Sequence, residues 1–313
     1  MPDTHPSVLA MGEPLLEFNA AAEGTLESST ALHIGFGGDT SNMAIAARRS
    51  GASTGYLTRV GDDAFGQALA ELWRREGVDT THVLTEPGGA TGIYFITRHG
   101  GGKHAFTYRR AGSPASRLTP DDVPLRAVAA ARLLHISGIT QAISPSACDA
   151  AFHAMESARA HSTLVSYDPN HRPALWPPAR ARAIVMRSAE LADIVLPNLD
   201  EGRLLTGVHQ PADVLAEFAA RGPAIVALKM GADGVLLGAE GRTTHVPAHR
   251  VVPTDATGAG DTFDGAFAAR LLDGDSPLEA ARYAVIAAAL TTTGHGAVGP
   301  IPTADTVRQA GDA

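Results

Sequence analysis

The stretch Asp255-Ala256-Thr257-Gly258-Ala259-Gly260-Asp261 places a glycine-rich turn and a carboxylate directly before a segment with helical spacing. Apolar side chains recur at roughly helical intervals over residues 262–272, so the turn is expected to open an amphipathic helix. Free N–H groups and the positive end of the helix dipole favour an anion there, and glycine permits its close approach. The stretch therefore predicts a phosphate site beside a base. The alternative interpretation is that Asp261 only caps the helix.

The composition of the chain limits the class of protein. Its 313 residues are 44% hydrophobic, enough to bury one large core or two modest ones. The formal net charge of -8 argues against a broadly basic nucleic-acid surface. Cys148 has no second cysteine to pair with, and no secretory signal pattern begins the sequence, so we expect a cytoplasmic location. No apolar run is long enough to predict a membrane span.

Strand-like apolar runs alternate with segments of helical length along most of the chain. The runs that predict strands are residues 8–11, 54–60, 133–136, 164–167, 194–196 and 225–228. Segments such as 64–75, 145–160 and 214–221 have the length and single apolar face of helices. The alternation predicts an α/β fold with a mainly parallel sheet covered by helices.

Two stretches, 13–36 and 91–110, interrupt this alternation with short β-rich runs divided by glycine and polar residues. They predict a small antiparallel lid, with a hairpin turn at residues 100–102. We expect one domain over residues 1–313, with the lid as its subdomain.

Competing motifs lack the context that their chemistry requires. The Walker pattern for phosphate binding is missing. Residues 294–299 match the dinucleotide pattern G-x-G-x-x-G, but too little chain follows for a strand, helix and second strand. His245 and His249 flank Pro247, which is incompatible with a helix that would align them as zinc ligands.

Three polar clusters accompany the glycine-rich turn. Residues 35–42 combine glycines with hydrogen-bonding side chains at the start of a helical run, which suits a polyhydroxylated substrate. Residues 168–172 and 198–201 each follow a predicted parallel strand, at the edge where α/β sheets gather ligands. We expect these clusters to share one cleft with the turn. A capped helix at 35–42 and structural loops at the other two are the alternatives.

This ordered set of motifs resembles the ribokinase-like carbohydrate kinases, the PfkB family. The resemblance spans nearly the whole chain and rests on Gly37-Gly38, on the Asn-x-x-Glu element at 198–201 and on Gly258-Ala259-Gly260-Asp261-Thr262-Phe263. Within the family, residues 36–42, 91–94, 108–110, 134–139 and 168–176 look like those of 2-keto-3-deoxygluconate kinases. Two positions depart from the pattern, because Ala256 and His171 stand where threonine and tyrosine are common.

The resemblance implies a ribokinase-like three-layer α/β/α core with a β-sheet lid, ATP as phosphoryl donor and Mg²⁺ as metal, with K⁺ a further candidate. It implies that Asp261 is the general base and that Gly258, Ala259 and Gly260 form the anion hole. Asn198 and Glu201 would hold Mg²⁺ through water. The nucleotide side would comprise Asn198, Lys229, Gly231, Gly234, Gly258 and Gly260. The sugar side would comprise Gly37, Gly38, Asp39, Asn42, Tyr94, Tyr108, Arg110, Arg172 and Asp261.

The leading functional hypothesis is an ATP-dependent 2-keto-3-deoxygluconate kinase that forms the 6-phosphate. Arg172, with Arg110 or Arg109, would clamp the carboxylate of this acidic sugar. The alternatives are another sugar kinase of the family, such as a fructokinase or a 5-dehydro-2-deoxygluconate kinase, and a non-catalytic sugar or nucleotide sensor. A homo-oligomer, as a dimer through the lid or larger, is also expected, since an exposed sheet gains from being covered.

Two of these assignments have plain alternatives. Lys229 would be a surface lysine after an edge strand. Tyr94 and Tyr108 would serve only to pack the lid.

Overall fold

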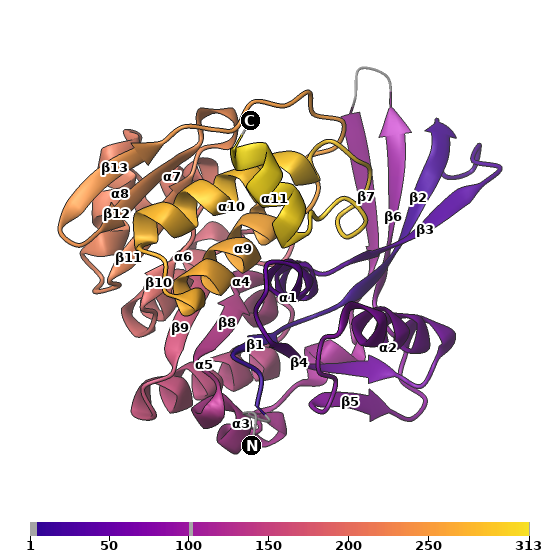
Figure 1. Ribbon diagram of the computed structural model, residues 1–313. Coiled ribbons are helices and arrows are strands. Elements are labelled where there is room, and N and C mark those ends of the chain that lie inside the picture. Colours follow the sequence, from indigo (N-terminus) through magenta and orange to yellow (C-terminus); the bar gives the residue numbers. More distant parts are fainter. Residues whose placement is uncertain (1–4, 100–102, 313) are drawn as a thin grey trace.

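The computed structural model describes residues 5–99 and 103–312, and the predicted turn at 100–102 lies outside these residues. The described chain contains a nine-stranded sheet between two layers of helices and a separate four-stranded sheet (Figure 1). The large sheet runs in the order β13 (Arg242–Val246), β12 (Val235–Ala239), β11 (Ile225–Lys229), β10 (Ile194–Val195), β9 (Leu164–Asp168), β8 (Leu133–Ser137), β1 (Val8–Met11), β4 (Thr54–Gly61) and β5 (Val83–Glu86). Neighbours from β11 to β5 are parallel, which confirms the predicted sheet, whereas β12 and β13 add an antiparallel edge.

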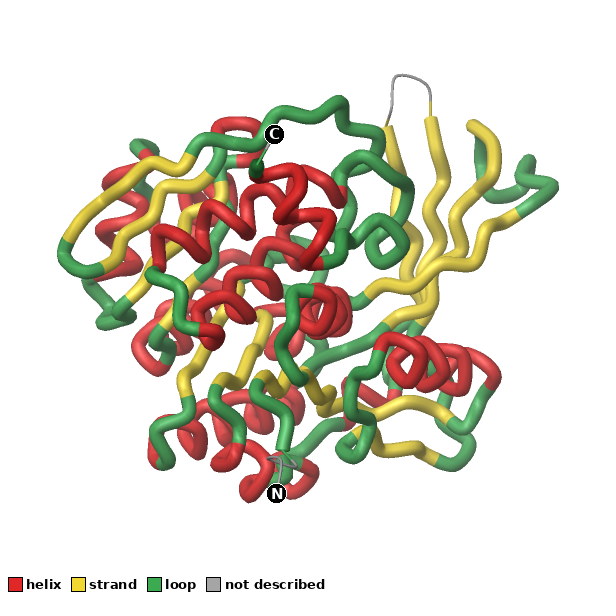
Figure 2. Tube along the Cα trace, viewed as in Figure 1, coloured by secondary structure: helices red, strands yellow, loops and turns green. Residues whose placement is uncertain are grey.

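Both faces of the large sheet are covered, as Figure 2 shows. In β1, Val8 and Ala10 belong to one hydrophobic core and Leu9 and Met11 to the other, and all four are fully buried. A strand buried on both faces is apolar throughout, which explains the uninterrupted run in the sequence. One face is covered by α1 (Asp39–Arg49), α2 (Ala64–Glu76), α9 (Ala259–Asp273), α10 (Pro277–Thr291) and α11 (Ala304–Gly311). The other is covered by α3 (Leu125–Ala130), α5 (Pro145–Ala160), α6 (Pro178–Leu191), α7 (Leu199–Thr206) and α8 (Pro211–Ala219).

A short helix, α4 (Gly138–Ala142), directly follows β8. None of the helices in the described part of the chain has both the length and the apolar character needed to cross a lipid bilayer.

The lid sheet stands beside the helical body, with the strand order β3 (Leu32–Gly37), β2 (Leu15–Glu23), β6 (Ile93–His99) and β7 (Lys103–Arg109) (Figure 1). The prediction of a wholly antiparallel lid is wrong at its centre, because β2 and β6 are parallel. The outer pairs, β2 with β3 and β6 with β7, are antiparallel hairpin partners. Between the two hairpins the chain passes through α1, β4, α2 and β5, and a long crossover of this kind permits parallel pairing.

The joint between lid and core is tightly built. Gly38 alone separates β3 from α1, and its φ of 102° and the 2.6 Å from a would-be Cβ to the Glu13 carbonyl oxygen both require glycine. Glu13, which follows β1, is buried, accepts a hydrogen bond of 2.5 Å from Ser113 Oγ and forms an ion pair with Arg110. The Glu13 carboxylate therefore links the segment that enters the lid to the segment that leaves it.

Candidate active site

The polar clusters predicted from the sequence meet at the carboxyl ends of the parallel strands. Asn170, which follows β9, donates from Nδ2 to Asp39 Oδ2 at the start of α1, at 2.8 Å. Asn42, one turn into α1, donates from Nδ2 to Asp261 Oδ2 at 2.8 Å. Asn170 has a φ of 36°, a conformation that asparagine tolerates better than most residues. The structure thus brings the 35–42, 168–172 and 255–261 segments together.

The glycine-rich turn forms the N-terminus of α9. Gly258 is the N-cap residue with a φ of 76°, and a Cβ there would lie 2.8 Å from the carbonyl oxygen of Ala297. Within the described part of the chain, the N–H groups of Gly260 and Asp261 have no backbone acceptor. The turn therefore offers free donors, the positive end of a helix and space that a side chain would fill, which fits a phosphate group.

Asp261 does not cap its helix. No side chain makes a capping hydrogen bond at the N-terminus of α9, and the Asp261 carboxylate accepts from Asn42 instead. The capping interpretation is therefore wrong. Withdrawal from water and the neighbouring Asp39 raise the pKa of Asp261 to about 7, against the lowering effect of the Asn42 hydrogen bond. A carboxylate that titrates near neutral pH is suited to accept a proton during catalysis.

The first turn of α1 likewise has no side-chain cap, so the capping alternative for residues 35–42 is wrong. Asp39 Oδ1 and Asn42 Oδ1 are both buried without a hydrogen-bond partner in the described structure. Buried polar oxygens in a cleft normally have partners, and sugar hydroxyl groups would supply them.

Lys229 lies at the end of β11 inside the sheet. Because β11 pairs with β10 and β12, the alternative of a surface lysine after an edge strand is wrong. Its Nζ is 3.0 Å from Asp168 Oδ2 and 2.9 Å from Asp264 Oδ1. Burial alone would lower the pKa of Lys229, but Asp168 and Asp264 raise it above its usual range.

Asp264 was not identified from the sequence. It lies three residues after Asp261 and is buried, as are Phe263 and Phe267 of the same helix. The sequence did contain one signal for Asp264, because an acidic residue stands there among the large apolar side chains of a helix. A charge in such a position needs a buried partner.

The lid contributes aromatic side chains to the sugar side. A Cβ at Gly37 would lie 2.5 Å from Tyr94 Oη, so glycine leaves room for this ring. The Tyr94 hydroxyl donates to Glu17, and the ring stacks on Tyr108 with centroids 5.6 Å apart. Tyr94 also belongs to the small lid core, whereas Tyr108 is 40% exposed. Packing of the lid therefore accounts for part of what Tyr94 does.

The three arginines expected to bind the sugar differ in how strongly neighbouring groups hold their side chains. The Arg110 guanidinium lies 5.5 Å from the Tyr108 ring centroid and is paired with Glu13. Arg109 is exposed and donates to the Tyr108 carbonyl at 3.1 Å. Arg172 is also exposed and donates only to the carbonyl of its neighbour His171, at 3.2 Å. Arg109 and Arg172 are therefore both freer than Arg110 to turn toward a carboxylate.

Asn198 and Glu201 form a capping box at the start of α7. The Asn198 N–H donates to Glu201 Oε1 at 2.6 Å, and the Glu201 N–H donates to Asn198 Oδ1 at 2.9 Å. Glu201 Oε2 accepts from the His171 N–H at 2.8 Å, and burial with Asp168 nearby raises the pKa of Glu201 to about 7. Direct ligation of a metal would break this cap, whereas a hydrated Mg²⁺ could still contact the remaining lone pairs. Residues 5–99 and 103–312 contain no group of three or more His, Cys, Asp or Glu residues suited to hold a metal ion.

Two glycines after β11 have different surroundings. Gly231 has a φ of 60°, and no atom lies within 4 Å of a Cβ added there. At Gly234, with a φ of 87°, an added Cβ would lie 2.1 Å from the Val246 carbonyl oxygen. Gly234 therefore serves close backbone packing, while the space beside Gly231 is open to a ligand.

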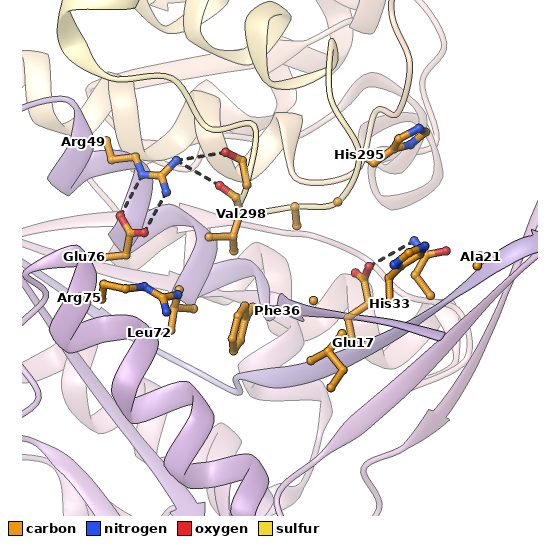
Figure 3. Close-up of a pocket in the computed structure, with 16 residues that line it drawn as sticks. Glu17, Ala21, His33, Phe36, Arg49, Leu72, Arg75, Glu76, His295 and Val298 are labelled. Carbon is orange, nitrogen blue, oxygen red and sulfur yellow. Dashed lines mark hydrogen bonds and ion pairs between the residues drawn. The ribbon is translucent and has the colours of Figure 1, made fainter. Parts of the chain in front are cut away.

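A groove of about 550 Å³ separates the lid from the 294–299 loop (Figure 3). Arg49 fixes this loop, donating to the Val298 carbonyl at 3.2 Å and pairing with Glu76 at 2.9 Å (Figure 3). The groove contains none of residues 255–261, but Ala297 lines it and also packs against Gly258. The loop that matches the dinucleotide pattern therefore supports the glycine-rich turn from one side.

Comparison with known proteins agrees with this geometry. The model of the pfkB family carbohydrate kinases matches residues 5–304. A 2-dehydro-3-deoxygluconokinase of Thermoproteus tenax is 37% identical over 288 residues, which cover 91% of this chain and 87% of that protein. Fructokinase-1 of Zea mays is 33% identical over 313 residues, covering 96% of both chains.

Among solved structures, a putative ribokinase II from E. coli in complex with ATP and Mg²⁺ superposes with a TM-score of 0.90 at 26% identity, covering 97% of this chain and 98% of that one. The fold, the site and the family match lead to one conclusion: the chain belongs to the pfkB family of carbohydrate kinases.

Proposed function

We propose that this chain is an ATP-dependent kinase that phosphorylates 2-keto-3-deoxygluconate on its 6-hydroxyl group. The observation that carries the proposal is the position of Asp261. Its carboxylate is oriented by Asn42, has a pKa raised to about 7 and lies next to the free N–H groups of the turn. The 2-dehydro-3-deoxygluconokinase of T. tenax, at 37% identity, supports the choice of substrate.

In the proposed reaction, Asp261 takes the proton of the sugar hydroxyl as its oxygen attacks the γ-phosphate. Asn42 holds the carboxylate in place, and the Gly260 and Asp261 N–H groups donate to the transferring phosphate. ATP with its Mg²⁺ supplies the phosphoryl group and neutralises its charge when bound. We place the nucleotide on the side of Asn198, Gly231 and Gly234, with the metal held through water. Lys229, also expected there, lies behind this side with its Nζ bonded to Asp168 and Asp264.

The sugar is placed between α1 and the lid. Asp39 Oδ1 and Asn42 Oδ1 would accept from its hydroxyl groups, and Tyr94 and Tyr108 would line it. Arg172 is the proposed partner of the carboxylate, because planar guanidinium donors match it and the side chain is free to move. Arg110 would contribute from the lid while it remains paired with Glu13.

Fructokinase is the second candidate. The Z. mays relative is similar over 96% of its length. Arg110, one of the arginines expected to bind the carboxylate of an acidic sugar, already has its charge neutralised by Glu13. A neutral sugar would need no such ligand.

One coupled ATP-consumption assay separates these candidates. The substrates are 2-keto-3-deoxygluconate, its galactonate epimer, 5-dehydro-2-deoxygluconate and fructose, each with Mg²⁺ and with or without K⁺. Highest kcat/KM for the acidic keto sugar would support the proposal, and highest kcat/KM for fructose would replace it. Binding of sugar without turnover of any substrate would favour a sensor.

A further inference from the structure

Lys229 lies at the centre of an acidic cluster directly behind the glycine-rich turn. Its Nζ is 3.0 Å from Asp168 Oδ2, and 2.9 Å and 3.1 Å from the two carboxylate oxygens of Asp264. The same Nζ is 3.6 Å from the position of a Cβ at Gly260, so the ammonium group touches the turn from inside the protein.

The hydrogen bonds of Lys229 leave its ammonium group no free donor for a nucleotide phosphate. A lysine ammonium has three donors, and the three contacts with Asp168 and Asp264 account for all of them. The side chain is only 12% exposed, and its partners are 7% and 1% exposed. A direct contact with ATP phosphates would require this buried group to leave its carboxylates, which is costly.

The charges around Asp261 come from five elements. They are Asp39 of α1, the Tyr94 phenol of β6, Asp168 of β9 and Lys229 of β11, together with Asp264, which lies three residues after Asp261 on α9. Lys229 is the only cation in this set. Every other group in it opposes the ionised form of Asp261 or is neutral.

We propose that Lys229 is a positioning residue of the kinase, whose buried charge keeps Asp261 ionised and so available as the base. The inference rests on the proposed function, in which Asp261 accepts the proton. Lys229 acts through space from behind the turn, and Asp168 and Asp264 hold it there. The influence of Lys229 on Asp261, which lowers the pKa of that carboxylate, agrees with this role.

The test is the pH dependence of kcat in Lys229→Met. Loss of the Lys229 charge should raise the pH below which kcat falls, the acid limb of the profile, by about one pH unit. A charge several ångströms away in a partly buried site has an effect of this size on a pKa. The KM for ATP should change by less than about threefold. An acid limb that coincides with that of the wild type, together with a large rise in the KM for ATP, would show that Lys229 is a nucleotide ligand instead.

Removal of Lys229 alone leaves two buried carboxylates without a cation and can prevent folding. Lys229→Gln removes the charge but keeps hydrogen-bond donors for these carboxylates, and it should show the same upward shift. Arg270→Met is the matched control for lost ion pairs. Arg270 pairs with Asp273 and Asp275 at the other end of α9, roughly 14 Å along the helix from Asp261, so its loss should lower Tm and leave the limb in place.

A second readout needs no turnover. The difference in unfolding free energy between a protein and its Asp261→Asn counterpart varies with pH between the pKa of Asp261 in the unfolded chain and its pKa in the folded chain. We expect the upper end of this pH range to lie about one pH unit higher in the Lys229→Met background. An unshifted upper end would overturn the role of Lys229, whereas a shifted upper end without sugar phosphorylation would contradict the proposed reaction alone.

Discussion

At the scale of single residues, the proposed role of Asp261 as a base places two opposing requirements on its carboxylate. A base must be ionised to accept a proton, but the cleft around Asp261 favours its neutral form and raises its pKa to about 7. We therefore expect kcat/KM to fall below about pH 7 as Asp261 becomes protonated. The Asp261→Asn variant should keep its fold and lose about 10²- to 10⁴-fold in kcat, measured in the coupled assay. Turnover close to that of the wild type would disprove the assignment.

The same residue should make the protein less stable at high pH. Because the pKa of Asp261 is about 7 in the folded chain and about 3.9 in an unfolded one, the folded state binds the extra proton between these values. Stability contributed by this group is therefore lost as the pH rises from about 4 to 7. Asp261→Asn should raise the unfolding free energy at pH 8 by as much as about 4 kcal/mol, and much less at pH 4. Denaturant titrations at both pH values measure this, and an equal effect at both would contradict it.

We expect Arg172 to decide the charge preference for the substrate. Loss of one charge-assisted hydrogen bond costs about 1.5 to 3 kcal/mol, so Arg172→Ala should raise the KM for the acidic sugar by roughly 10- to 150-fold. Arg187→Ala, which removes an exposed arginine paired with Glu190 on α6, is the control and should change nothing. If both variants keep the wild-type KM, Arg172 does not bind the carboxylate.

At the scale of elements, the turn before α9 depends on its backbone conformation. Gly258→Ala would place a Cβ 2.8 Å from the Ala297 carbonyl oxygen in a backbone conformation with φ 76°. We expect kcat to fall by about 10-fold or more and stability to fall by about 1 to 3 kcal/mol. Gly274→Ala is the matched control at the other end of α9, where φ is 106° and no atom lies within 4 Å of the added Cβ. It should lower Tm with little effect on kcat, and a similar loss of kcat in both variants would argue against an anion hole at Gly258.

Much of the arrangement of elements was predictable, because β1, β4, β8, β9, β10 and β11 are mainly apolar runs and apolar runs between helices favour a parallel sheet. The antiparallel strands β12 and β13 were missed, since their half-buried residues give a weaker pattern. The parallel pairing of β2 with β6 was also beyond local sequence, which specifies hairpins but not which hairpins meet.

Local sequence likewise predicted only part of the candidate site. Glycines and carboxylates of the 255–261 turn identified the phosphate side, yet the roles of Asp264, Glu13 and Glu17 arise from contacts between distant segments. Local sequence also could not show that Asn198 and Glu201 cap each other.

At the scale of the whole molecule, the edge of the lid predicts self-association. β3 is an edge strand, and its Leu32 and Ile34 are 38% and 66% exposed. We expect a dimer through this sheet, and Ile34→Lys should shift it toward monomer in sedimentation velocity. Leu204→Lys, which changes a 49% exposed leucine on α7, should not. A wild-type monomer at all concentrations would refute the expectation.

The single glycine between β3 and α1 has a mechanical consequence. The strand that forms the lid edge continues through Gly38 into the helix whose first turn carries Asn42, and Asn42 holds the carboxylate of Asp261. The lid and the proposed base are thus linked along a short stretch of backbone. Under the proposed function, a sugar that moves the lid would also move Asn42, and we therefore expect ATP hydrolysis in the absence of sugar to be slow.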